Sequence, residues 1–199
     1  MPAATTNNKG AEAVVTAFTL FDTNLGRCAL IWRGGLVVGA SLPEASDRAL
    51  RASVARRFPG AVELIPPAPI AEVIAMLVRL LAGEKVDLRS IACAPDVGPF
   101  EAQVLEHARA IPHGETRTYG EIAAQIGTPG AARAVGRALG ANPIPILIPC
   151  HRVVAAAGRS GGFSAPGGAS TKMRILEIEG AGRGSAPMLF EHLPWRMKE

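Results

Sequence analysis

The spacing of apolar positions in the first forty residues predicts a small antiparallel sheet. Apolar or β-branched runs cover residues 14–20, 29–32 and 36–40. The two connecting segments, 22–26 and 33–35, have the composition of tight turns. Three short strands joined by two tight turns form a meander, so we expect the chain to begin with such a sheet.

Helical patterns follow the predicted sheet. Residues 46–57 have the composition of a short helix, and a proline-rich break follows at 65–69. Apolar residues then recur at helical spacing in two segments, at Ile70, Ile74, Leu77 and Leu81 and at Phe100, Val104, Leu105 and Ala108. Gly83 and Pro112 end these patterns. The chain is therefore expected to have an α+β fold with two domains, at 12–92 and 97–182.

The second half begins with a local helix signal. Thr118 and Glu121 have the spacing of a capping box, which predicts a helix over 119–126. A glycine-bounded turn and a second short helix over 131–139 follow. Two short helices across a tight turn resemble a helix-turn-helix, although many helical hairpins with this pattern bind nothing.

Composition and charge narrow the classes of function. With 48% apolar and 19% charged residues the chain is not a disordered one. The net charge of the chain is +4, and the positive excess is concentrated in residues 112–174. This segment has seven basic side chains and only two acidic ones, Glu115 and Glu121. Such a segment is typical of a nucleic-acid-binding surface, and equally of a solvated basic face.

Membrane and secretion signals are missing from the sequence. No apolar run is long enough to cross a bilayer, and the first ten residues have the composition of a polar tail and lack the apolar run of a signal peptide. The three cysteines are far apart and form no CxxC pair, which favours free thiols in a reducing compartment. We therefore expect a cytoplasmic protein without a membrane partner.

Three consecutive side chains carry the candidate chemistry. Cys150, His151 and Arg152 follow a short apolar run that ends at Pro149. A basic imidazole or a cation near a thiol favours the thiolate, which is the nucleophilic form. The alternatives are a buried structural cysteine, which suits Cys28 and Cys93, and a Cys-His hydrolase. The remaining histidines lack metal-ligand spacing, so no metal site is expected.

Five motifs in order resemble the O6-alkylguanine-DNA alkyltransferases. They lie at 111–127, 132–136, 142–145, 148–153 and 176–180, and the Pro-Cys-His-Arg-Val run is the family's signature. The resemblance implies an RNase H-like first domain and a winged helix-turn-helix-like second domain. It also implies cofactor-free, irreversible, single-turnover transfer of an alkyl group from O6 of guanine, with O4 of thymine as a second candidate position. The partner would be double-stranded DNA, bound by a monomer that flips the damaged base.

The resemblance also assigns roles to residues of this chain. Cys150 would be the nucleophile, with His151 as its base through a water molecule and Glu179 orienting that histidine; Glu177 is the competing carboxylate. Tyr119 would donate a proton to the leaving guanine, and Asn142 would brace the turn that holds the thiol. The implied DNA-binding residues are Thr118, Ala132, Arg133, Arg137 and Arg152. The implied pocket residues are Pro145, Val153, Phe163, Ser164 and Lys172.

One departure from the family pattern affects the pocket. The family runs from an aromatic-Ser-Gly-Gly motif directly towards the lysine, whereas this chain inserts Ala165 and Pro166 and has Phe163 in place of a tyrosine. We expect a differently shaped pocket loop. The rival functions are a lesion sensor, which would lack the nucleophile, and a dimeric helix-turn-helix regulator that reads base edges.

Overall fold

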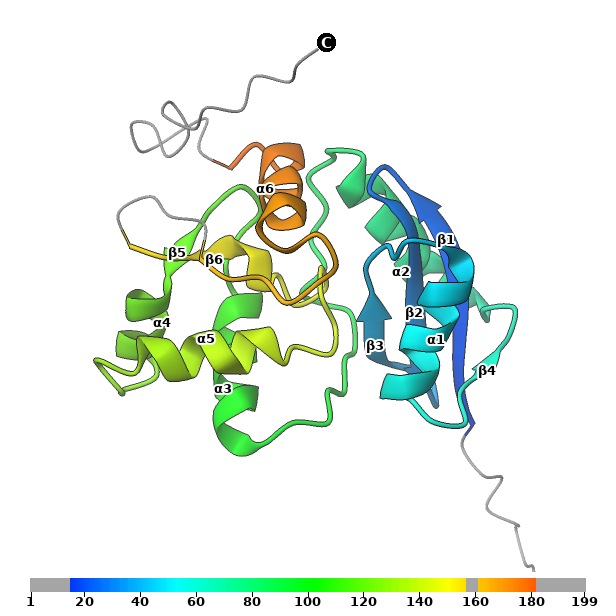
Figure 1. Cartoon of the computed structure of the whole chain (residues 1–199), viewed down its shortest axis with the longest axis horizontal. Helices are drawn as coiled ribbons and strands as arrows, with labels where there is room; N and C mark the ends of the chain where they lie inside the picture. Colours follow the sequence, from blue (N-terminus) through cyan, green and yellow to red (C-terminus); the bar gives the residue numbers. More distant parts are fainter. Residues whose placement is uncertain (1–14, 157–160, 182–199) are drawn as a thin grey trace, which may run out of the picture.

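The predicted meander is present in the computed structural model, which describes residues 15–156 and 161–181 (Figure 1). Its strands are β1 (Thr16–Thr23), β2 (Gly26–Arg33) and β3 (Leu36–Ser41), paired antiparallel. The first turn is tighter than the segment predicted, because β1 continues to Thr23 and β2 begins at Gly26. A two-residue strand, β4 (Val62–Glu63), pairs parallel to β1 and gives the sheet order β3-β2-β1-β4.

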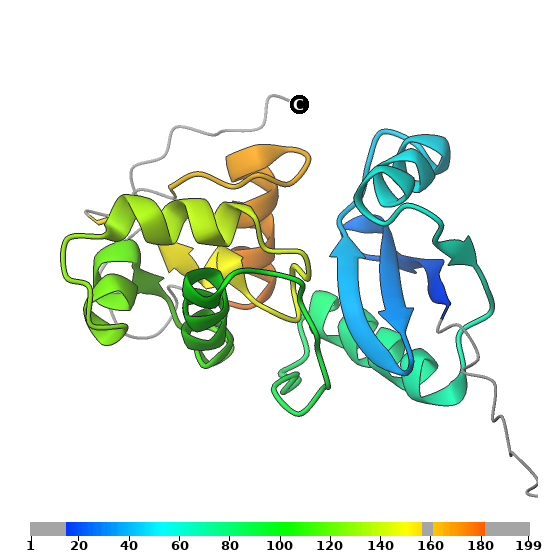
Figure 2. The same ribbon diagram turned by 90° about the horizontal axis from the view of Figure 1, so that it is seen from below.

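One helix covers each face of this sheet (Figure 2). Phe18, Ala29 and Ile31 point to one face, where they pack with Leu50 and Val54 of α1 (Asp47–Arg57). The intervening strand residues point to the other face and pack with α2 (Ala68–Leu81). Burial on both sides explains why the strands have continuous apolar runs instead of a clean alternation.

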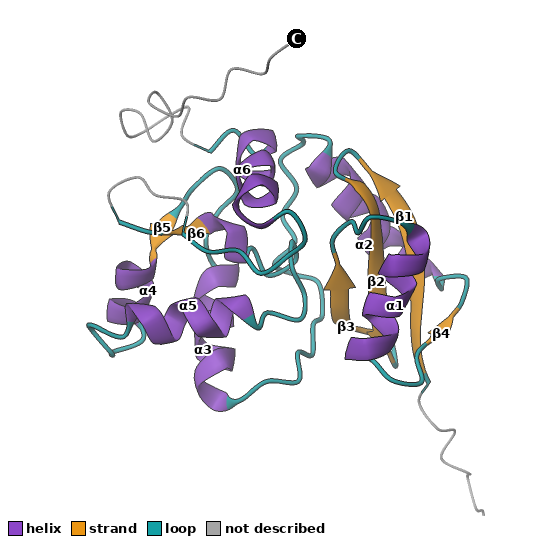
Figure 3. Cartoon of the chain, viewed as in Figure 1, coloured by secondary structure: helices purple, strands orange, loops and turns teal. Residues whose placement is uncertain are grey.

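The second lobe is mainly helical (Figure 3). Its elements are α3 (Pro99–Arg109), β5 (Arg117–Thr118), α4 (Tyr119–Gln125), α5 (Ala132–Gly140), the 3₁₀ turn η1 (Cys150–Arg152), β6 (Val153–Val154) and α6 (Gly168–Ile178). The short strands β5 and β6 pair in parallel and join the start of α4 to the end of η1. The predicted α+β class is confirmed, and the predicted helix bounds lie within two residues of those observed.

Local capping fixes the start of α4, as the sequence predicts. The Thr118 hydroxyl accepts from the Glu121 backbone N–H at 3.1 Å, and the Glu121 carboxylate accepts from the Thr118 N–H at 2.6 Å. This capping box satisfies two backbone donors that the helix leaves free. Gly127 and Gly130 adopt positive φ in the turn that leads to α5.

The two lobes share one apolar core. A single cluster of buried side chains includes Leu30 and Leu77 of the first lobe and Val104 and Val135 of the second. Backbone contacts also cross the junction, where the Ala40 N–H donates to Pro143 O at 2.9 Å. The sheet lobe therefore helps to position the segment that leads to Cys150.

Some predictions fall outside the described residues or stay open. The polar tail, Arg159 of the basic segment and His192 lie outside the described residues, as do the outer limits of both predicted domains. The division at 12–92 and 97–182 stays a prediction. Within the described part of the chain, no helix has the length and apolar character needed to cross a membrane.

Candidate active site

The 3₁₀ turn η1 sends its three side chains into different surroundings. Cys150 is 7% exposed and lines a cavity, His151 is fully buried, and Arg152 is buried against α6. Neighbouring residues of a strand would have pointed to opposite faces. The turn instead lets the thiol reach a cavity while the imidazole stays inside.

The segment before η1 is held by Asn142. Its side-chain N–H donates to Ile148 O at 2.8 Å, and its side-chain oxygen accepts from the Ile144 N–H at 3.0 Å. Between these two points Ile146 has φ of 75°, a left-handed conformation that is strained for a β-branched residue. Asn142 therefore closes a strained loop that ends at Cys150, the bracing position that the resemblance implied.

Glu179, at the end of α6, binds two side chains of η1. His151 Nε2 donates to Oε1 at 3.1 Å, and Arg152 donates from Nη2 to Oε1 and from Nε to Oε2, both at 2.8 Å. Burial opposes ionisation of this carboxyl, but the hydrogen bonds from His151 and Arg152 lower the pKa of Glu179 well below its usual range. The competing candidate, Glu177, is exposed.

The same contacts define the basic nitrogen of His151. An ionised carboxylate only accepts hydrogen bonds, so Nε2 carries the proton in the neutral imidazole and Nδ1 is its free base. Nδ1 is buried and has no hydrogen-bond partner within the described residues. Burial lowers the pKa of His151 and outweighs the opposing effect of Glu179, so the ring is neutral and able to accept a proton near pH 7.

The prediction that Arg152 contacts DNA is wrong for this structure. Its guanidinium is buried, binds Glu179 through two nitrogens, and donates from Nη1 to Ile111 O at 2.6 Å. Three of its five N–H donors are bonded inside the protein and the side chain is only 8% exposed, so it is held away from a duplex. Arg152 therefore links η1 to the end of α6 and to the segment that follows α3.

The charge of a buried lysine, Lys172, acts to lower the pKa of the Cys150 thiol. Burial raises the pKa of Cys150, whereas a hydrogen bond from Asn142 and the charge of Lys172 act to lower it. Lys172 is fully buried, donates from Nζ to Val153 O at 2.6 Å, and has a pKa lowered by burial to about 8. Its ammonium charge is therefore still present near pH 7, where it stabilises the thiolate.

Tyr119 stands at the start of α4, close to the thiol. Its Oη donates to Gly162 O at 3.3 Å, and Lys172 Nζ lies 5.6 Å from the centre of its ring. A Cβ atom at Gly161 would lie 2.7 Å from the same ring. Sequence reasoning missed Gly161, although its position in a glycine pair just before Phe163 is a usable signal.

Two cavities reach Cys150. The first, which we call the α5 cavity, measures about 920 Å³ and is lined by Thr118, Tyr119, Ala132, Arg133, Gly136, Arg137, Phe163 and Ser164 among others. The second, the interlobe cavity, measures about 570 Å³ and is lined by Ser41, Arg57, Pro143, Pro145, Phe163, Ser164, Ala165 and Pro166 among others. The thiol is thus accessible from the α5 side and from the lobe junction.

Most of the predicted site residues gather around these cavities. Arg133 and Arg137 are exposed on α5, and Thr118 and Ala132 lie beside them. Two pocket predictions need correction, because Val153 and Lys172 are fully buried and line neither cavity. Both residues lie behind the side chains that line the cavities, and Lys172 Nζ donates a hydrogen bond to Val153 O there.

Comparison with known proteins agrees with this geometry. Residues 99–181 match the family model described as 6-O-methylguanine DNA methyltransferase, DNA binding domain. The methylated-DNA--protein-cysteine methyltransferase of Mycobacterium bovis is 55% identical over 80 residues, 40% of this chain and 47% of that protein. The same-named protein of Mycobacterium leprae is 44% identical over 111 residues, 55% of this chain and 64% of that protein. The aligned sequence thus spans about half the length of these curated relatives.

A solved structure extends the likeness across both lobes. The structure of Mycobacterium tuberculosis OGT in complex with DNA matches 82% of this chain and 92% of that chain, with 34% identity and a TM-score of 0.69. This chain belongs to the O6-methylguanine DNA methyltransferase family. Within the family's framework, the sheet lobe of this chain is matched in structure although the family model covers only the second lobe.

Replacing Glu179 tests the buried clamp, by which we mean its contacts with His151 and Arg152. In Glu179→Gln the Arg152 charge loses its counter-charge, so the free energy of unfolding at pH 7 should fall by about 3–5 kcal/mol in urea titrations. The ionised carboxylate stabilises the fold above its unfolded pKa and this contribution is lost as pH falls towards the lower folded value. The difference from wild type should therefore narrow below pH 4.5.

Glu177→Gln is the matched control, because it removes an exposed carboxylate from the same helix. Its free energy of unfolding should stay within about 0.5 kcal/mol of wild type. Equal destabilisation by both variants would contradict the clamp.

Proposed function

We propose that this chain repairs DNA by transferring an alkyl group from O6 of guanine to Sγ of Cys150. The observation that carries the proposal is the position of Cys150, at a cavity beside α5 and next to the buried His151–Glu179 pair. The names of its relatives support the same activity. The proposed partner is double-stranded DNA that contains O6-alkylguanine, bound by a monomer without a cofactor.

The chemistry balances without a co-reactant. The thiol proton passes through a water molecule to Nδ1 of His151, and the thiolate attacks the alkyl carbon. The new C–S bond forms as the bond between that carbon and O6 breaks, and guanine leaves with a proton supplied through Tyr119 Oη. The product thioether has no acidic proton and is a poor leaving group, so each molecule acts once.

The charges around Cys150 explain how a buried thiol can react. Burial alone would hold the proton on sulfur, but Lys172 and Asn142 stabilise the thiolate and His151 supplies the base. Glu179 fixes the imidazole with Nδ1 unprotonated and offsets the positive charge that develops on the ring. Asn142, Glu179 and Lys172 are positioning residues in this scheme.

The DNA-binding surface in this proposal centres on α5. Ala132 and Gly136 are small enough for a close approach of the helix to DNA, and exposed Arg133 and Arg137 supply positive charge at the cavity rim. We assign α4 and α5 to a winged helix-turn-helix-like unit and the sheet lobe to an RNase H-like unit. The target carbon is unreachable inside a base stack, so the nucleotide must flip into the α5 cavity with Arg133 filling its place.

The inserted residues shape the interlobe cavity. Ala165 and Pro166 both line it, together with Phe163 and Pro145. We propose that this cavity receives the alkyl group that projects from the flipped base, so that the inserted loop sets how large a group is accepted. The location in the cytoplasm, expected from the three free cysteines, stays a prediction.

Intact-mass measurement tests the transfer. After mixing with excess duplex that contains one O6-methylguanine, wild type should gain about 14 Da, as a methyl group replaces the thiol proton. Cys150→Ala should gain nothing, and Cys28→Ala should gain the same mass as wild type. Tight lesion binding without a mass gain would identify a sensor, and neither binding nor transfer would favour the helix-turn-helix regulator.

Arg133→Ala tests the DNA surface. The single-turnover rate with duplex substrate should fall about tenfold or more at sub-saturating DNA, since a phosphate or gap-filling contact is lost. The rate with free O6-benzylguanine base should be unchanged, because the thiol and its relay are intact. Arg56→Ala, an exposed arginine on α1, is the control and should match wild type with both substrates. An equal loss with the free base would contradict the assignment.

A further inference from the structure

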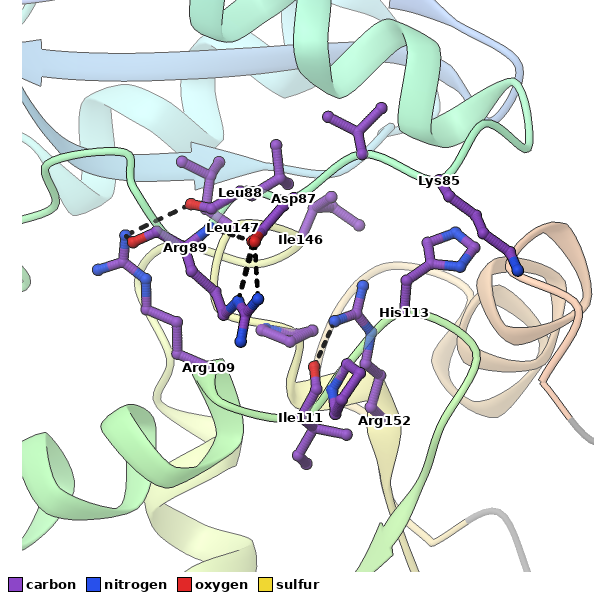
Figure 4. Close-up of a pocket in the computed structure, with 13 residues that line it drawn as sticks. Lys85, Asp87, Leu88, Arg89, Arg109, Ile111, His113, Ile146, Leu147 and Arg152 are labelled. Carbon is purple, nitrogen blue, oxygen red and sulfur yellow. Dashed lines mark hydrogen bonds and ion pairs between the residues drawn. The ribbon is translucent and has the colours of Figure 1, made fainter. Parts of the chain in front are cut away.

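A third cavity lies behind the reactive turn and is lined by basic side chains. It measures about 190 Å³ and lies between the loop after α2, the end of α3 with the loop that follows it, and the segment 146–149 (Figure 4). Arg152 lines this cavity, whereas Cys150 lines the α5 and interlobe cavities. This cavity, which we call the basic pocket, shares no lining residue with either of the other two, so it is separate from the proposed reaction site.

Positive charge dominates the basic pocket. Its basic residues are Lys85, Arg89, Arg109, His113 and Arg152, and Asp87 is the only acidic residue that lines it among the described residues. The Asp87 carboxylate accepts from Arg89 Nη2 at 2.7 Å and from its Nε at 3.0 and 3.1 Å. Those hydrogen bonds from Arg89 hold the pKa of Asp87 at about 2, so the carboxylate is ionised and pairs with Arg89. Glu179 pairs with Arg152 in the same way, and burial lowers the pKa of His113. Lys85 and Arg109 are the cations of this lining that have no ion pair among the described residues.

Two side chains carry buried donors that the protein leaves unused. Arg109 donates from Nη2 to Arg89 O at 2.9 Å, but its Nε is enclosed and has no hydrogen-bond partner in the described residues. Both ring nitrogens of His113 are also enclosed and unpaired there. In Figure 4 the Lys85 side chain runs beside the His113 ring. Enclosed polar atoms without partners are rare in proteins, and here they lie among cations.

The size of the pocket limits what it can hold. Sites for drug-sized ligands measure about 300–1,000 Å³, well above this volume. A small tetrahedral ion with a few waters fits, and its oxygens would accept from the guanidinium, ammonium and imidazole groups that face the cavity. We propose that the basic pocket binds a small oxyanion of the phosphate or sulfate class.

The proposed anion would sit next to the clamp of the reactive turn. Arg152 faces this pocket and also binds Glu179, which binds His151. A bound anion therefore adds negative charge on the far side of the guanidinium that holds the relay. The binding proposal stands on the pocket alone and does not depend on the proposed function.

Binding of inorganic phosphate to the full-length chain tests the proposal. Phosphate would be titrated against sodium chloride at constant ionic strength, with the midpoint of thermal unfolding as one readout, since a ligand of the folded state raises it. The second readout is the imidazole NMR signal of His113, assigned by its loss in His113→Gln. Both should change saturably with one dissociation constant. A parallel titration with sulfate distinguishes a general oxyanion site from one selective for phosphate.

Two charge variants make the test specific. Lys85→Gln should weaken phosphate binding about fivefold, because it removes a cation from the rim. Asp87→Asn should tighten it by about the same factor, because it removes the competing carboxylate and frees Arg89. A variant that merely loosens the fold would not bind phosphate more tightly, and Arg56→Gln on α1 should bind like wild type.

Two results would overturn the proposal. One is the lack of a saturable change in either readout, or an equal change with chloride alone. The other is unchanged phosphate binding in both Lys85→Gln and Asp87→Asn, which would place the anion elsewhere.

Discussion

The carboxylate of Glu179 holds the reactive turn through two side chains at once. Arg152 forms a two-point ion pair with it and also binds Ile111 O, while His151 uses the same carboxylate to fix its ring. Buried ion pairs add little net stability over apolar contacts, but breaking one leaves an uncompensated charge and is costly. The clamp therefore acts mainly by permitting one geometry of η1, in which Cys150 reaches the cavities and His151 keeps a free basic nitrogen.

A second constraint acts on the other side of Cys150. Asn142 closes the 142–148 loop over the strained Ile146, and Pro143 in that loop accepts hydrogen bonds from Ala40 and from Arg57 at 2.8 Å. The sheet lobe contributes no nucleophile or base, yet it holds this loop in place. The same lobe is matched in structure by a family member, beyond the range of the family model.

Local patterns in the sequence predicted the elements well, and tertiary pairing explains what they missed. The capping box at Thr118 and the helical repeat of α2 are set by neighbours in the chain. Strand β4 has two residues and exists only because β1 lies beside it, so no periodicity marks it. The left-handed conformation of Ile146 likewise has no sequence signal.

Tertiary pairing also decides the roles of charged residues that the sequence alone does not settle. The family resemblance implied Arg152 as a DNA contact, and only its pairing with a residue 27 positions away shows that it is held inside the protein. Helical periodicity in the sequence distinguishes Glu179 from Glu177. Lys172, Ile175, Leu176 and Glu179 recur at spacings of three and four, which marks them as the buried face of α6. The same spacing places Lys172 on the buried face, although the resemblance had implied it as a pocket residue.

The most direct test of the account is the pH dependence of single-turnover alkyl transfer in wild type and His151→Gln. Burial lowers the pKa of His151 from 6.5, so the wild-type rate should be level through neutral pH and fall only in acid, where the base becomes protonated. Burial also raises the pKa of Cys150 above 9.0, so His151→Gln should be slow at pH 7 and gain about tenfold in rate per pH unit towards alkaline pH. Identical pH profiles and rates in the two proteins would contradict the claim that His151, held by Glu179, activates the buried thiol.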